Sequence, residues 1–168
     1  MAGAIEAVLL ALNTAGVRYL VVGGIAVVLH GHLRTTADLD LVVQLTSDNI
    51  LRAIRALEDL GYRPRAPVPA ERLADPAARE AWSREKELTV FSLWSDVFPG
   101  LELDLFITEP FDFDDAYSRA VRVTLDTTTA TVVSASDLIA LKQAAGRPID
   151  LADVEALREI GKDVTEDE

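Results

Sequence analysis

The spacing of apolar residues along the chain predicts a series of short helices. Apolar residues recur at every third or fourth position within residues 4–15 and again within residues 48–60. Asp75-Pro76 is a typical helix start, because aspartate caps the first turn and proline fits it. The helices expected from these signals cover residues 4–15, 25–29, 48–60, 76–86, 137–145 and 150–160.

Short runs of β-branched and aromatic residues predict the strands. These runs cover residues 17–22, 39–45, 88–93 and 101–107, and residues 121–126 and 131–133 are expected to form a hairpin. Residues 62–70 are rich in proline and are expected to be irregular. The order of elements predicts an α+β fold, in which a mixed β-sheet is flanked by helices that cover mainly one face.

The length of 168 residues predicts one domain with a sizeable core. We expect residues 1–134 to form this core and residues 135–161 to form a C-terminal pair of helices packed on it. Residues 162–168 are expected to form an acidic, solvated tail.

Two aspartates stand out because they interrupt an apolar strand. Asp38 and Asp40 alternate with leucines, so both carboxylates point to one face, roughly 6.5–7 Å apart at the backbone. Carboxylates this close repel each other unless a cation lies between them, and Mg²⁺ prefers oxygen ligands. The alternative is a solvated strand edge without a ligand.

A third carboxylate is expected from the segment 101–106. Leucines alternate there with Glu102 and Asp104, so these two acidic residues share the face opposite the core. If this strand neighbours the first, Asp104 completes a cluster of three carboxylates able to hold Mg²⁺ or Mn²⁺. Asp104 would then also serve as general base for an attacking hydroxyl, with Glu102 as the competing candidate.

Gly23-Gly24 follows a buried strand and precedes a short helix. Glycines at such a bend allow a phosphate to approach the backbone closely, although a plain turn is the alternative. Arg34 and Thr36 lie just before the acidic pair. Each has two interpretations: Arg34 balances the carboxylates or contacts a nucleotide, and Thr36 bonds phosphate or shapes the strand entry.

The whole pattern resembles the nucleotidyltransferase fold of the DNA polymerase β type. The matching segments are Val21-Val22-Gly23-Gly24, Asp38-Leu39-Asp40, Leu103-Asp104-Leu105 and the C-terminal run from Asp137 to Leu157. Among the members of this superfamily, the chain is similar to minimal nucleotidyltransferases and to the AbiEii-type proteins of toxin–antitoxin modules. Glycine stands at position 24, where many catalytic relatives have serine.

This resemblance implies a fold and an activity. A nucleoside monophosphate would pass from an NTP to an acceptor hydroxyl on a protein, a tRNA or a small molecule. Asp38, Asp40 and Asp104 would be the catalytic and metal-binding residues, and Gly23, Gly24 and Lys142 would contact the phosphates. A cognate toxin or antitoxin is the implied partner.

Charge and composition limit the other possibilities. The formal net charge is −12 and there is no cysteine, which excludes disulfides, thiol nucleophiles and cysteine-based zinc sites. The absence of cysteine fits a reducing, cytoplasmic setting, which we expect for this protein. No apolar run approaches the roughly 20 residues of a membrane span, so we expect no membrane partner. The arginines between residues 63 and 84 are offset by neighbouring acidic residues, which favours a solvated surface over an RNA-binding one.

Two other functions remain open at this stage. One is a non-catalytic antitoxin or nucleotide-binding subunit paired with a HEPN-like partner, and the other is a metal-dependent phosphohydrolase. Near the C-terminus, Asp150 is expected to be a helix N-cap and Asp153 to complement the helix dipole. Arg147 follows the end of the preceding helix, where the helix dipole favours a cation, and a contact with phosphate is the alternative.

Overall fold

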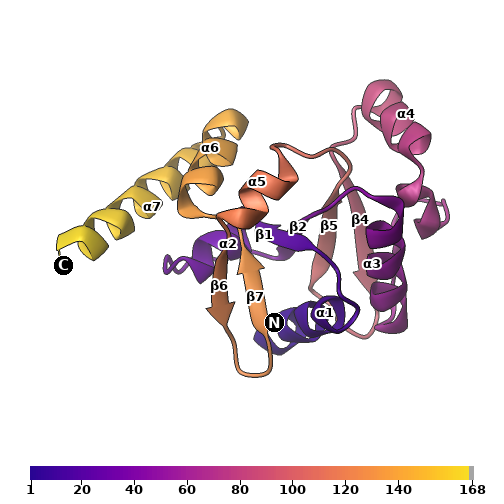
Figure 1. The fold of residues 1–168 in the computed structure, drawn as a ribbon, viewed down its shortest axis with the longest axis horizontal. Coiled ribbons are helices and arrows are strands. Elements are labelled where there is room, and N and C mark those ends of the chain that lie inside the picture. Colours follow the sequence, from indigo (N-terminus) through magenta and orange to yellow (C-terminus); the bar gives the residue numbers. More distant parts are fainter. Residues whose placement is uncertain (167–168) are drawn as a thin grey trace.

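One mixed, seven-stranded β-sheet forms the centre of the computed structural model, which describes residues 1–166 (Figure 1). Its strands are β1 (Tyr19–Val22), β2 (Asp38–Val43), β3 (Tyr62–Pro64), β4 (Val90–Ser95), β5 (Glu102–Phe106), β6 (Val121–Thr124) and β7 (Thr129–Val132). They lie in the order β3-β4-β5-β2-β1-β7-β6. Strand β2 runs parallel to β5, and β1 runs parallel to β7, whereas the other neighbouring strands are antiparallel.

Helices surround the sheet unevenly. The α-helices are α1 (Ala2–Thr14), α2 (Gly23–Leu29), α3 (Ser47–Asp59), α4 (Pro76–Lys86), α5 (Phe113–Ser118), α6 (Ala135–Ala145) and α7 (Pro148–Glu166). A 3₁₀ helix, η1 (Ala70–Ala74), packs between α3 and α4. Helices α1 and α3 pack against each other, and α6 and α7 form a separate pair from which the end of α7 projects (Figure 1).

Alternation of buried and half-buried residues in β4, β5 and the first part of β2 gives this part of the sheet one buried face and one partly open face. Leu39, Leu41, Leu103 and Leu105 are fully buried in the core. Burial of each such side chain stabilises the fold by roughly 1.5–3 kcal/mol. The intervening residues of β4 and β5 and the two aspartates of β2 are only half-buried, whereas Val42 of β2 is buried. The predicted α+β architecture, with a mixed sheet and a C-terminal helix pair, is therefore confirmed.

Several element boundaries differ from the sequence-based expectations. The proline-rich segment 62–70 contains the edge strand β3, where Pro64 removes a hydrogen-bond donor at little cost. Helix α5 is an additional element, capped by Asp112, whose side chain accepts a hydrogen bond from the Asp115 backbone N–H. The other predicted helices and strands are present with boundaries that differ by a few residues.

The last helix is longer than expected. It begins at Pro148, two residues before the predicted cap, and continues to Glu166, so most of the expected tail is helical. The final residues of that predicted tail, 167 and 168, lie outside the described residues. No helix within residues 1–166 has the length and apolarity needed to cross a bilayer.

Candidate active site

The acidic residues meet because β2 and β5 are parallel neighbours in a defined register. Asp38 is the Cα partner of Glu102, and Asp40 is the Cα partner of Asp104. All four side chains extend from the half-open face, since their leucine neighbours fill the core. The condition set by the sequence analysis, that the two acidic strands lie side by side, is fulfilled.

A hollow of about 310 Å³ adjoins three of these carboxylates, and we call it the central hollow. Its lining comprises Gly23, Gly24, Arg34, Thr36, Asp38, Asp40, Asp104, Lys142, Arg147 and Ile149. Every residue that the sequence analysis assigned to catalysis, metal binding or nucleotide binding therefore borders one space, apart from Glu102, the competing candidate for the base. Arg147, for which a contact with phosphate was the alternative to a structural role at a helix end, also lines it.

Gly23 lies where the chain passes from β1 into α2, in contact with Asp40. Its φ of +68° falls in the left-handed region, which residues with a side chain rarely adopt. A Cβ atom at this position would lie 2.0 Å from Asp40 Oδ2. At Gly24, a Cβ atom would lie 2.7 Å from Thr36 Oγ1. The two glycines thus begin helix α2 itself, and both keep the wall of the central hollow free of side chains.

The carboxylates of the central hollow repel one another. Burial and, to a smaller extent, the nearby charges of Asp104 and Asp38 together raise the pKa of Asp40 to about 7, against the opposing effects of Lys142 and Arg147. Burial and the charge of Asp104 also raise the pKa of Asp38. A divalent cation would relieve this repulsion.

The donor chemistry suits a hard cation, although the side chains are not gathered into a coordination sphere. Among residues 1–166, no three acidic or histidine side chains converge closely enough to hold a metal ion. Asp104 Oδ1 accepts a hydrogen bond of 2.6 Å from Ser92 Oγ, and Glu102 pairs with Arg65. The carboxylates therefore fit a metal by their oxygen chemistry, and their side chains would have to rotate to surround one.

A network of charged residues forms the far wall of the central hollow, and all of it except the exposed Arg147 side chain is largely buried. Lys142 Nζ lies 2.9 Å from Asp153 Oδ2 and 3.4 Å from Asp150 Oδ1. Arg34 Nε lies 3.0 Å from Asp153 Oδ1, and Arg147 Nε lies 2.7 Å from Asp150 Oδ2. The three cations outnumber the two aspartates, so this wall carries a net positive charge.

Two members of this network correct the sequence-based interpretation. Asp150 is not the N-cap of α7; it is the third residue of the helix and accepts a hydrogen bond from the Arg147 backbone N–H. Its hydrogen bond with the Arg147 side chain lowers its pKa. Asp153 is nearly fully buried and pairs with Lys142 and Arg34. The Asp-x-x-Asp spacing on one helix face was the available signal for this pair.

The histidines near the end of α2 lie outside the candidate site. His30 Nε2 lies 2.8 Å from the carbonyl oxygen of Val133, which ties the end of α2 to the segment after β7. Neither His30 nor His32 lines the central hollow.

Comparison with known protein families identifies the chain as a nucleotidyltransferase of unknown function. Residues 4–162 match a family model described as "Nucleotidyltransferase of unknown function (DUF6036)". Among curated proteins, no sequence matches the chain.

Three solved structures share the fold. The lincosamide antibiotic adenylyltransferase LnuA, bound to lincomycin, is 17% identical with a TM-score of 0.58, covering 88% of this chain and 90% of its own. ANT(2″)-Ia in complex with adenylyl-2″-tobramycin is 16% identical with a TM-score of 0.60, covering 97% and 88%. An antigenic nucleotidyltransferase-like protein from Paracoccidioides brasiliensis is 17% identical with a TM-score of 0.59, covering 91% and 73%.

Proposed function

Because the chain belongs to this family of nucleotidyltransferases of unknown function, we propose that it moves a nucleoside monophosphate from an NTP to an acceptor hydroxyl with Mg²⁺ or Mn²⁺. The observation that carries the proposal is the meeting of Asp38, Asp40 and Asp104 with Gly23 and Gly24 around the central hollow. ATP is the first nucleotide to test, since LnuA is an adenylyltransferase and the ANT(2″)-Ia structure holds an adenylylated product.

The carboxylates would hold the metal. Asp38, Asp40 and Asp104 supply oxygen ligands, and a bound ion would neutralise phosphate charge during the transfer. Asp104 would also accept the proton of the acceptor hydroxyl, and Glu102 is the alternative base on the same strand.

The glycine wall and the cationic wall would receive the triphosphate. With no Cβ atom at Gly23 or Gly24, phosphate oxygens can approach the backbone of the first turn of α2. Lys142 and Arg147 face the same space and provide positive charge for the phosphates. The buried aspartates hold both cations in place.

A largely apolar space next to the central hollow suits the nucleobase. This hollow of about 380 Å³ shares Gly23, Asp40, Lys142 and Arg147 with the central hollow. Its remaining wall is mostly apolar and includes Val90, Phe106, Leu138 and Leu141. The planar base of a nucleotide would be shielded from water there, while the phosphates of the same nucleotide remained beside Lys142 and Arg147.

The biological setting stays a prediction. The resemblance to AbiEii-type proteins implies a toxin–antitoxin or phage-defence module with a cognate partner, and a cytoplasmic location agrees with that setting. Co-purification of the chain with the products of adjacent genes is the direct measurement.

Transfer itself is tested with NTPs labelled at the α-phosphate. Wild-type protein with Mg²⁺ is expected to release pyrophosphate and attach the label to an acceptor in cell extract. A variant with Asp38→Asn and Asp40→Asn is expected to lose both signals, whereas Glu85→Gln, which removes one exposed charge on α4, should retain them. Equal labelling by the aspartate variant would contradict the proposal, and release of inorganic phosphate without labelling would indicate a hydrolase instead.

A further inference from the structure

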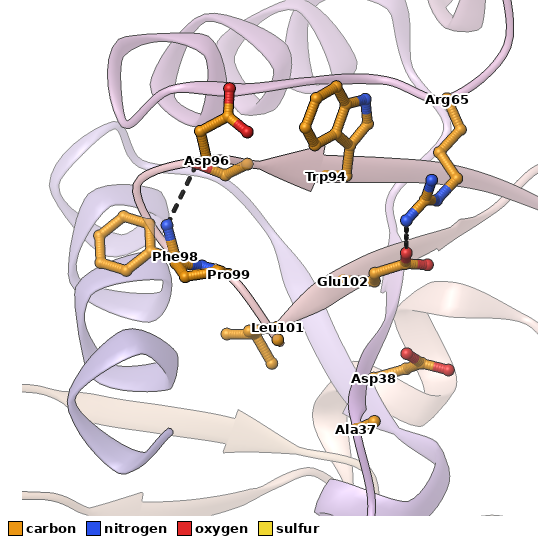
Figure 2. A pocket seen from close by; sticks show the side chains of 11 residues that line it. Ala37, Asp38, Arg65, Trp94, Asp96, Phe98, Pro99, Leu101 and Glu102 are labelled. Carbon is orange, nitrogen blue, oxygen red and sulfur yellow. Dashed lines mark hydrogen bonds and ion pairs between the residues drawn. The ribbon is translucent and has the colours of Figure 1, made fainter.

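Another hollow, larger than the central hollow, lies on the other side of Asp38, and we call it the edge hollow (Figure 2). It has a volume of about 560 Å³, within the range of small-molecule sites. Asp38 is the one lining residue that it shares with the central hollow. A molecule in the edge hollow would therefore meet a nucleotide in the central hollow at this carboxylate.

The sheet places aromatic and charged side chains in a row leading to Asp38. Arg63 on β3 is the Cα partner of Trp94 on β4, and Glu102 on β5 is the Cα partner of Asp38 on β2. Leu93 pairs with Leu103, so the residues beside them, Trp94 and Glu102, are neighbours on the opposite, half-open face. Figure 2 shows Trp94 between Arg65 and Asp96, with Glu102 and Asp38 below it.

The side chains around Trp94 in the edge hollow already contact two arginines of the same chain. The Arg63 guanidinium carbon lies 4.4 Å from the centroid of the Trp94 ring, and that of Arg65 lies 6.0 Å from it. Arg63 pairs with Asp96, and Arg65 pairs with Glu102. Both arginine side chains are 55% exposed, so a ligand cation can displace them at small cost.

We propose that the edge hollow binds the acceptor, and that the acceptor is a small molecule carrying both hydroxyl and ammonium groups. This inference rests on the proposed nucleotide transfer. Three carboxylates line the hollow (Asp38, Asp96 and Glu102) against the single guanidinium of Arg65. The indole of Trp94 and the apolar side chains of Phe98 and Leu101 complete a wall suited to the carbon skeleton of such a molecule.

The same charges oppose a nucleic-acid acceptor. A tRNA end would bring phosphates toward three carboxylates, which outnumber the single arginine that lines the hollow. In the transfer, the acceptor oxygen forms a bond to the α-phosphorus while the bond from that phosphorus to the bridging oxygen breaks. Pyrophosphate leaves with the bonding electrons, and the hydroxyl proton passes to a carboxylate, Asp104 or Glu102.

Binding is tested without nucleotide, so that its outcome is independent of catalysis. The probes are the trimer of glucosamine, at a mildly acidic pH where its amines are protonated, and the trimer of N-acetylglucosamine, which keeps the ring hydroxyls without the charges. Calorimetry is expected to show at least tenfold tighter binding of the glucosamine trimer, weakening as salt is added. Equal binding of the two trimers, or binding of neither, would overturn the inference.

Variants connect the binding to the edge hollow. Asp96→Asn and Trp94→Ala are each expected to weaken binding of the glucosamine trimer at least fivefold, while binding of a fluorescent ATP analogue stays unchanged. Glu85→Gln on α4 removes a charge outside the hollow and serves as the matched control. If Asp96→Asn binds the trimer as tightly as wild type does, the edge hollow is not the site.

The labelling assay then distinguishes the proposal of nucleotide transfer from the proposal that the edge hollow binds the acceptor. Labelled nucleotide on the glucosamine trimer supports both of them. Trimer binding with no labelling of any acceptor supports the edge hollow and counts against nucleotide transfer. Labelling of RNA or protein by a chain that does not bind the trimer supports transfer and overturns the acceptor assignment.

Discussion

Gly23 is restricted to glycine by its backbone angle and by its neighbour. Alanine at this position would adopt an unfavourable φ of +68° and place its Cβ atom 2.0 Å from Asp40 Oδ2. We expect Gly23→Ala to lower the free energy of unfolding by about 1–3 kcal/mol and to reduce transfer more than tenfold, because Asp40 must move. Urea denaturation and the labelling assay measure the two effects.

Gly161 provides the matched control for this substitution. It lies within α7, and a Cβ atom there meets nothing within 4 Å. Gly161→Ala should therefore stabilise the protein slightly, by about 0.5–1 kcal/mol, and leave transfer intact. Equal losses of stability and activity in the two variants would show that the contact with Asp40 is unimportant.

The raised pKa of Asp40 makes the stability of the metal-free protein depend on pH. This pKa rises from 3.8 to about 7 on folding, so the folded state keeps a proton that the unfolded state releases between those values. Stability should therefore fall as pH rises from about 4 to about 7, by at most about 4 kcal/mol from this group.

The comparison with Asp40→Asn isolates that contribution. The variant cannot ionise, so its free energy of unfolding relative to wild type should increase steadily across the same pH range. Denaturant titrations of both proteins in the presence of a chelator measure the difference. If the difference in the free energy of unfolding between the two proteins does not change with pH, folding does not raise the pKa of Asp40.

At the residue scale, the sequence was informative where one local rule decides an orientation. The period of two in a strand was enough to place Asp38, Asp40 and Asp104 away from the core. It could not reveal the burial of Asp150 and Asp153, because that depends on the packing of α7 against α6 and on contacts with Arg34, more than 100 positions away.

At the scale of elements, the α6–α7 pair depends on its buried charges. Arg34 Nε and Asp153 Oδ2 lie within ion-pair distance of their partners without a well-directed hydrogen bond, so the pairs depend on charge. We expect Asp153→Asn to destabilise the protein by about 3 kcal/mol, since it leaves Lys142 and Arg34 undercompensated in a buried site. Asp163→Asn, on an exposed part of the same helix, should have little effect.

A double-mutant cycle tests whether the effect comes from the pair. Lys142→Met and Asp153→Asn should each be destabilising, whereas the double variant should lose less than the sum of both, with a coupling energy of about 1–3 kcal/mol. Denaturant titrations of all four proteins give the values. Strict additivity would assign the loss to packing of α7 and not to the ion pair.

The length of an element decided how well it could be predicted. The four-residue strand β1 and the alternating strands β2 and β5 carry clear apolar patterns, and their predicted positions were nearly correct. The three residues of β3 and the six of α5 are too few to show a period. Strand β3 forms because β4 offers it an open edge, which is a property of the folded sheet and not of the segment.

At the scale of the whole molecule, the charge distribution separates candidate acceptors. The formal net charge is −12, and the arginine-rich segment is not a free cationic surface, because Arg63, Arg65 and Arg84 form ion pairs. Arg79 is buried and donates to the carbonyl of Leu73. These pairs and the burial of Arg79 reduce the positive charge that this segment offers to phosphates.

We accordingly expect very weak binding of tRNA, with a Kd above about 100 μM at physiological salt, which is at the weak end of non-specific binding. Fluorescence anisotropy with labelled tRNA measures this affinity. A variant with Glu80→Lys and Glu85→Lys on the exposed side of α4 should bind at least tenfold more tightly and lose that gain as salt rises, because it reverses two charges beside the existing arginines. Submicromolar binding by the wild type, with a steep salt dependence, would instead show that the paired arginines open to receive phosphates and would return tRNA to the possible acceptors.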